Sequence, residues 1–182
     1  MACGSDVDTD GTTTGTTTTD TAGSDEADNE ALAACGTEAC PEGFAQRIEG
    51  GDPFTINFMA CIVEAVRDRK PGLYRVTLDH TFGNGAEVSE YAIFVTASGE
   101  VEVGVRRFDE VDGASEESWD PTERCTLKPQ AFFEDCLTAV NAGDQIDATP
   151  EAFACIYPES GAGDSQELPW FEGCEAQAPT CE

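Results

Sequence analysis

The sequence predicts an α+β domain that follows a long acidic tether, and three observations support this fold class. The composition of the 182-residue chain changes near Cys35. Beyond that point, a segment with helical periodicity precedes three short segments whose apolar residues alternate. Eight of the nine cysteines also lie there, which favours a domain held together by disulfides. We therefore expect two regions, a tether over 1–34 and a single disulfide-rich domain over 35–182.

Residues 1–34 are predicted to be a disordered tether. They hold eight acidic residues, nine threonines and no lysine or arginine. Aromatic residues are absent, and Val7 and Leu32 are the only large aliphatic residues. Such a segment cannot bury enough apolar surface to offset the entropy lost when its backbone is ordered. We expect only a short helical turn at its end, around 29–34.

A helix is predicted to begin at Asp52 and Pro53, because aspartate is a favoured N-cap and proline suits the first helical position. Basic residues crowd its last turn, where the helix dipole favours cations, and Pro71 followed by Gly72 ends it. Its apolar face is formed by Phe54, Phe58, Cys61, Ile62 and Ala65, and is widened by Met59, Val63 and Val66.

Three strands are predicted over 73–82, 88–96 and 101–105. Apolar and polar residues alternate in each, as expected for strands buried on one face. Gly-Asn-Gly at 83–85 and Ser-Gly at 98–99 are turn signals between them. The three strands should therefore form an antiparallel meander whose apolar face is covered by the preceding helix.

The rest of the domain is predicted to be a helical, disulfide-stapled cap. Residues 111–122 resemble an acidic loop, and helices are expected over 129–140 and 149–156. Residues 159–182 look irregular, and we expect Cys174 and Cys181 to hold them in place.

The cysteines predict disulfides rather than a metal site. They form no paired CxxC units, and the chain has one histidine, so no structural zinc site is expected. This density favours an oxidising compartment. Eight cysteines allow 105 pairings, among which the short loops Cys35–Cys40 and Cys174–Cys181 are sterically possible. The eight candidates are Cys35, Cys40, Cys61, Cys125, Cys136, Cys155, Cys174 and Cys181.

Cys3 is the odd cysteine, and the sequence around it resembles a bacterial lipoprotein. Ala2-Cys3-Gly4 resembles the end of a lipobox followed by the mature protein, and a polar Thr/Asp/Gly tether follows. The resemblance implies a signal peptide, a lipid such as palmitate on Cys3 and attachment to a membrane. Gly4, in place of aspartate, implies the outer membrane. Met1 and Ala2 are too short for a signal region, so we expect a trimmed leader or a misplaced gene start.

One partial motif and the single histidine could be given functional roles. Asp6–Gly11 reproduces the first half of an EF-hand loop, but Thr17 stands where the bidentate glutamate belongs, so we expect no calcium site. His80, on the apolar face of the first strand, is interpreted as a structural histidine that is hydrogen-bonded within or near the core. Asp79 points to the opposite face and is a poor catalytic partner.

The remaining candidates are acid pairs and exposed-looking aromatic residues. Glu116-Glu117 and Glu134-Asp135 could be interpreted as a glycosidase dyad, but such pairs arise by chance among 37 acidic residues. The aromatic residues in polar or irregular segments are interpreted as plugs of a small core, with binding anchors as the alternative. They are Trp119, Trp170 and Phe171.

Charge limits the function classes. The net charge of -28 opposes phosphate, so no nucleic acid partner is expected, and no apolar run is long enough for a transmembrane helix. We predict a lipid-anchored, extracytoplasmic domain of the bacterial cell envelope with a binding or structural role. No catalytic residue and no cofactor are predicted. The candidate partner is a basic envelope protein. The alternative is a carboxylate-dependent hydrolase acting on envelope polysaccharide.

Overall fold

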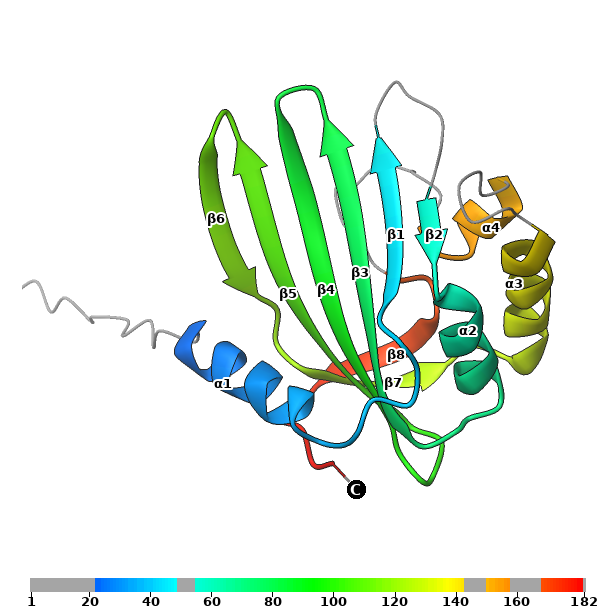
Figure 1. Cartoon of the computed structure of the whole chain (residues 1–182). Coiled ribbons are helices and arrows are strands. Elements are labelled where there is room, and N and C mark those ends of the chain that lie inside the picture. The colour runs from blue at the N-terminus through cyan, green and yellow to red at the C-terminus, as the bar shows by residue number, and fades with distance from the viewer. Residues whose placement is uncertain (1–21, 49–54, 143–149, 158–167, 182) are drawn as a thin grey trace, which may run out of the picture.

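The computed structural model describes residues 22–48, 55–142, 150–157 and 168–181 (Figure 1). Within these ranges the chain has the predicted mixed α+β character, with four helices and eight strands. The helices are α1 (Ala22–Ala33), α2 (Met59–Arg67), α3 (Gln130–Ala142) and α4 (Pro150–Ala154). The strands are β1 (Gly43–Ile48), β2 (Thr55–Asn57), β3 (Gly72–Phe82), β4 (Gly85–Val95), β5 (Val101–Val111), β6 (Ala114–Trp119), β7 (Glu123–Leu127) and β8 (Phe171–Ala176).

All eight strands described belong to one sheet, in the order β2-β1-β3-β4-β5-β7-β8, with β6 paired to β5. The β1–β3 pair is parallel, and the other pairs are antiparallel. The predicted meander is the pairing of β3, β4 and β5, each of 11 residues. A sheet of three strands was too small a prediction, because short strands from both ends of the chain extend it.

The main core lies where α2 packs beside the central strands. Ile62, Val63 and Val66 are fully buried, in one cluster with β-strand residues such as Tyr74 and Ile93. The helix begins at Met59 rather than near Asp52, because residues 55–57 form β2. Phe58 precedes the helix with a φ of 57° and is 60% exposed, so its predicted place on the apolar face was wrong. Phe54 and the predicted cap lie outside the described residues.

Helix α1 corrects the predicted tether. Residues 22–33 are helical, and Leu32 is fully buried in a second cluster with Leu73, Ala92 and Phe94. The fold therefore begins before Cys35. Disorder was expected because residues 1–34 carry so few apolar side chains, yet one leucine suffices when the sheet already offers an apolar patch. Residues 1–21, and with them Cys3 and Asp6–Gly11, lie outside the described residues.

The segment predicted as an acidic loop is a β-hairpin. Strand β5 continues to Val111, and β6 returns along it. Asp112 and Gly113 have φ values of 53° and 80°, which is the geometry of a two-residue type I′ turn. The Asp-Gly dipeptide is the signal for this turn, and the high charge of its flanking residues hid it from an analysis based on apolar alternation.

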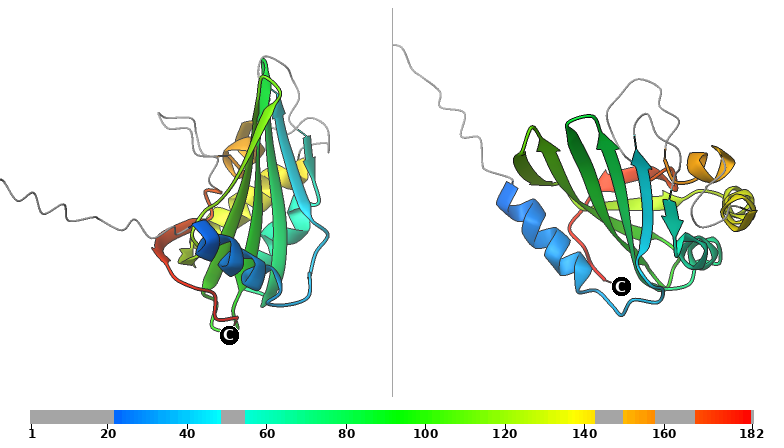
Figure 2. Two further views of the ribbon diagram at one scale, coloured as in Figure 1. Left: turned by 90° about the vertical axis from the view of Figure 1, so that its left-hand side faces the viewer. Right: turned by 45° about the horizontal axis from the view of Figure 1, so that its top comes forward.

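The C-terminal region is only partly helical. Helices α3 and α4 lie where helices were predicted, but residues 171–176 form β8, which pairs antiparallel with β7. Trp170 is fully buried, and its Nε1 donates a hydrogen bond to the Cys155 carbonyl oxygen at 2.8 Å. The interpretation of Trp170 as a core plug is confirmed. Figure 2 shows α2, α3 and α4 together on one side of the molecule, away from α1.

The eight predicted cysteines form four disulfides. The two short loops considered from the sequence are wrong, because Cys35 pairs with Cys181 and Cys40 pairs with Cys61. Sequence proximity misled the prediction, since the sheet brings distant segments together. The remaining pairs are Cys125–Cys174 and Cys136–Cys155.

Candidate functional site

The candidate site is the β5–β6 hairpin, called here the acidic hairpin and defined as residues 108–120. It lies at the end of the sheet away from the helices α2, α3 and α4 (Figure 1). Every residue from 109 to 118 is exposed. The hairpin contains six acidic residues and no lysine or arginine: Asp109, Glu110, Asp112, Glu116, Glu117 and Asp120.

Arg106 organises one face of the hairpin. Its Nε donates to Glu117 Oε1 at 2.8 Å, and its Nη1 lies 3.5 Å from Glu90 Oε2. The guanidinium also lies over the Phe108 ring at 4.1 Å and over the Trp119 ring at 5.1 Å. The hydrogen bond with Glu117 raises the pKa of Arg106. This cation is therefore held by two carboxylates and two rings.

Arg107 is also held by a carboxylate, on the opposite face of the hairpin. Its Nη2 and Nε donate to Asp120 Oδ2 at 2.7 and 3.0 Å. Burial opposes its charge, but the bond and the attraction to Asp120 together raise the pKa of Arg107. Both cations next to the hairpin are thus engaged. Within the described residues, no ion pair reaches Asp109, Glu110 or Glu116.

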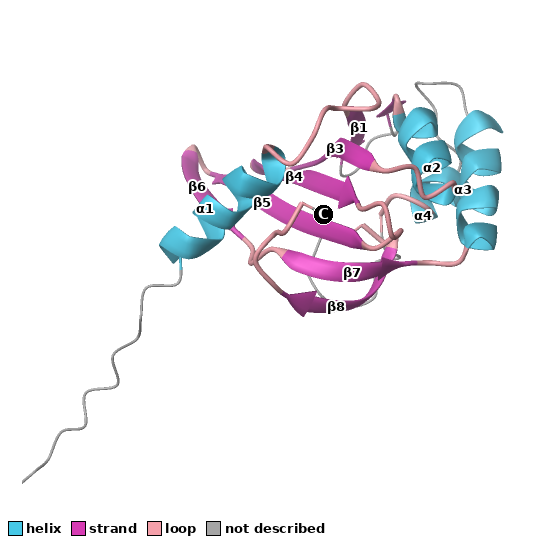
Figure 3. Ribbon diagram, turned by 90° about the horizontal axis from the view of Figure 1, so that it is seen from below, coloured by secondary structure: helices cyan, strands magenta, loops and turns pink. Residues whose placement is uncertain are grey.

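A groove of about 240 Å³ lies between α1 and one face of the sheet, and Trp119 contributes to its lining. Figure 3 shows α1 running across this end of the sheet, beside β6, β5 and β4. Two arginines and three glutamates line the groove, and Thr77 Oγ1 donates to Glu42 Oε1 at 2.6 Å. The groove carries both positive and negative side chains, whereas the hairpin carries negative ones only. The lining includes Glu30, Glu42, Arg75, Glu90, Arg106 and Trp119.

A second cavity, of about 340 Å³, lies on the other face of the sheet. Apolar side chains of β5 and of the segment around β8 form most of its lining, and the Arg107–Asp120 pair lies at its edge. The apolar residues include Val103, Val105, Leu168 and Phe171.

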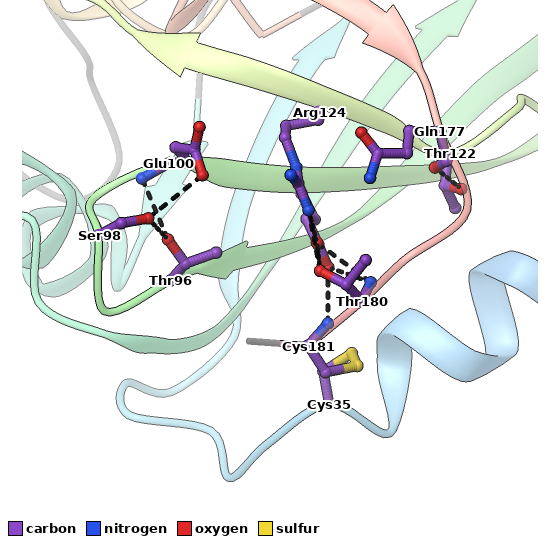
Figure 4. Close-up of polar contacts among 10 residues, drawn as sticks. Cys35, Thr96, Ser98, Glu100, Thr122, Arg124, Gln177, Thr180 and Cys181 are labelled. Atoms are coloured by element: carbon purple, nitrogen blue, oxygen red, sulfur yellow. Dashed lines mark hydrogen bonds and ion pairs between the residues drawn. A yellow bond between two sulfur atoms is a disulfide. The ribbon is translucent and has the colours of Figure 1, made fainter.

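The buried carboxylate of Glu102 forms a polar cluster with Arg124 and the C-terminal segment. Glu102 is 3% exposed and accepts hydrogen bonds from Thr180 N, Thr180 Oγ1 and Cys181 N, and from Arg124 Nη2 at 2.9 Å. Burial opposes its charge, but these bonds outweigh that effect and lower the pKa of Glu102. Figure 4 shows Arg124, Thr180 and Cys181 converging beside the Cys35–Cys181 disulfide. The cluster anchors the end of the chain.

The structure separates the residues that sequence analysis considered for catalysis. His80 and Asp79 lie on opposite faces of β3, as predicted, and Gln46 Nε2 donates to Asp79 Oδ2 at 2.9 Å. His80 Nε2 is buried without a hydrogen-bond partner among the described residues, so the predicted bond is not seen at this atom.

The acid pairs do not form dyads. Glu116 and Glu117 are consecutive in a strand and so point to opposite faces. Glu134 and Asp135 are exposed on α3. The pKa values of the carboxyl groups of Asp68 and Glu102 are displaced, and both move down. A general acid needs the opposite direction.

Among the residues that the structure describes, two groups of acidic residues and cysteines lie close enough to hold a metal ion. One comprises Cys35, Glu102 and Cys181, and the other comprises Glu123, Cys125 and Cys174. Each includes both cysteines of a disulfide, which cannot supply a thiolate. Neither group is therefore a metal centre.

Sequence analysis missed the acidic hairpin as a structural unit. It interpreted Trp119 as a core plug, whereas the side chain is half-buried and stacks with Arg106 at the groove. The Asp-Gly dipeptide between residues 106–111 and 114–119, which pair in the structure, is the sequence signal from which the hairpin could have been predicted.

No protein-family model, curated protein or solved structure matches the chain. Among the described residues, no helix has the length and apolar character needed to cross a membrane.

Proposed function

We propose that this protein is a lipid-anchored, extracytoplasmic binding domain of the bacterial cell envelope, which uses the acidic hairpin to bind a protein with a basic face. The observation that carries the proposal is the position of six acidic residues on one exposed hairpin from which lysine and arginine are absent. Arg106 and Arg107, which precede the hairpin on β5, are both engaged by carboxylates.

The charge of the whole molecule supports the same partner class. The region 35–182 has 29 acidic and nine basic residues, a net charge of -20. A field of this sign accelerates association with cations and opposes anions such as nucleic acids. A basic protein would be guided to the hairpin, where five exposed acidic residues lie within positions 109–117.

The four disulfides indicate an oxidising, extracytoplasmic compartment. The lipid anchor at Cys3 and the outer-membrane address belong to this proposal, on the lipoprotein-like Ala2-Cys3-Gly4 sequence. Mass spectrometry of the protein from its native host tests the anchor. A diacylated N-terminal cysteine supports it, and an unmodified Cys3 in released protein overturns it.

The alternative of a polysaccharide hydrolase has no specific observation in its favour. The pKa values of Asp68 and Glu102 both move down, which is opposite to what a general acid needs. Glu102 is also committed to the C-terminal segment.

The binding proposal is tested by capture of envelope proteins on the full chain carrying Cys3→Ser. A variant with Asp109→Asn, Glu110→Gln and Glu116→Gln removes three of the six acidic charges of the hairpin without touching the arginine pairs. The matched control neutralises three exposed acids elsewhere, with Glu134→Gln, Asp135→Asn and Glu172→Gln. We expect the hairpin variant to lose partners that the control retains, and high salt to release them. Equal capture by both variants would overturn the proposal.

A further inference from the structure

Strand β6 has an open edge. It pairs with β5 from Ala114 to Trp119, and no other strand among those described pairs with it. Figures 1 and 2 show no element beside its outer side in its distal part. Just past the lower end of β6, Asn29 Nδ2 of α1 donates to the Asp120 carbonyl oxygen at 2.8 Å, so α1 lies beside this end of the strand. The open stretch is 114–118, about 17 Å long at ~3.4 Å per residue.

The hydrogen-bond pattern identifies the backbone groups on this edge. Asp120 N donates to the Val105 carbonyl oxygen at 3.0 Å, so these residues form a hydrogen-bonded pair of the antiparallel ladder. Such pairs alternate along the ladder, so the backbone groups of Ala114, Glu116 and Ser118 face β5. Those of Ser115 and Glu117 face outward and are available to another strand.

The side chains decide which strand fits. Glu116 and Glu117 lie on β6, and Asp109 and Glu110 lie on the adjacent β5. Acidic residues on an open edge discourage pairing with a second copy of the same edge, because like charges would lie opposite one another. The same carboxylates favour lysine or arginine on the incoming strand, on both of its faces.

We propose that the open edge of β6 accepts an extended, basic segment of the partner protein as an additional strand. This inference rests on the proposed function and specifies how the acidic hairpin is recognised. Backbone hydrogen bonds from Ser115 and Glu117 would supply part of the affinity, and the carboxylates would select cationic side chains. Trp119 and its stacked Arg106 lie next to the lower end of the new strand.

The probe is a short, capped peptide in which pairs of lysines alternate with pairs of threonines, so that lysine lies on both faces of the extended strand. Its matched control has the same sequence and charge but carries N-methyl groups on the amides of both edges, so it cannot pair as a strand through either edge. On the protein, Ser115→Pro removes one outward N–H and leaves the β5 side of the ladder intact, and Ser115→Ala is its control. Binding is measured by titration, and hydrogen exchange is followed at the amides of 114–118.

We expect the unmodified peptide to bind the natural chain and Ser115→Ala equally and to protect the Ser115 and Glu117 amides. The Ser115→Pro variant should weaken binding roughly five- to tenfold, as expected for one lost hydrogen bond. The N-methylated peptide loses several such bonds and should weaken binding by at least as much. The peptide control needs no mutation, so the test holds even where Ser115→Pro fails to fold.

Equal binding of both peptides would overturn strand addition and leave charge-based binding intact. Binding of neither peptide would also overturn it, and the capture experiment then decides the proposed function separately. Protection of the same amides on self-association of the chain alone would show that a second copy occupies the edge, contrary to the inference.

Discussion

Glu102 is a buried carboxylate whose charge the fold requires. Because its pKa lies below the ordinary value of 4.5, it stabilises the fold fully above about pH 4.5, and this contribution is lost as the pH falls through the lowered pKa. Glu102→Gln should therefore lower the free energy of unfolding by ~2 kcal/mol at pH 7, the scale of charged hydrogen bonds. Urea denaturation at neutral and acidic pH measures the difference.

The difference between Glu102→Gln and the natural chain should shrink at low pH, where both residues are neutral. Glu100→Gln is a suitable control, because Glu100 is exposed in the neighbouring turn (Figure 4). It should change stability by less than about 0.5 kcal/mol. A constant deficit for Glu102→Gln at every pH would show that shape rather than charge matters at this position.

Gly104 is the contact point between β5 and α1. A Cβ atom at this position would overlap Asn29 Oδ1 and approach Leu32 Cδ2 to 3.1 Å. Since both neighbours lie on α1, Gly104→Ala should push the helix off the sheet and cost ~1–3 kcal/mol. Chemical denaturation tests this, with Gly83→Ala as the control because a Cβ there meets no atom within 4 Å. Equal stability of the two variants would mean that α1 shifts without cost.

At the scale of elements, the disulfide between Cys35 and Cys181 fastens the end of α1 to the last residues of the chain. Replacing both cysteines with serine should lower stability by ~2–5 kcal/mol, because the bond closes a long loop in the unfolded chain. Amide exchange in α1 should accelerate more than exchange in β3 or β4. Cys3→Ser provides the control for thiol loss, and unchanged exchange in α1 would contradict a clamping role.

The elements that apolar periodicity could identify were predicted. The strands β3, β4 and β5 and the helix α3 have enough alternating or helically spaced apolar residues to be found. Helix α1 has one fully buried leucine, Leu32, and a hydrogen-bonded asparagine, Asn29, so its order comes from the sheet rather than from its own sequence. Strand β8 depends in the same way on β7 and on Cys174.

The candidate site was harder to predict than the fold. Composition identified an excess of acid, but not its concentration on one hairpin, because β5 and β6 carry few buried side chains beyond Val105. The pairing of the cysteines could likewise not be predicted from the sequence. Cys35 and Cys181 are 146 residues apart and become neighbours only through the folding of the sheet between them.

At the scale of the whole molecule, the net charge of -28 should oppose compaction. Raising the salt concentration from low to physiological and beyond should stabilise the fold by roughly 1 kcal/mol, or about 2–4 °C in Tm for this size. Thermal melts over a sodium chloride series measure the effect. Near pH 4.1, the isoelectric point of the sequence, the salt dependence should vanish. Destabilisation by salt at pH 7 would mean that local ion pairs outweigh the general repulsion.

The Cys35–Cys181 bond also determines what proteolytic cleavage does to the protein. A single cut anywhere between these two cysteines leaves both fragments covalently joined, because the bond encloses nearly the whole domain. A nicked molecule would run as one species on a non-reducing gel and as two after reduction. In an oxidising compartment, where the bond persists, a clipped domain would therefore keep its two fragments together.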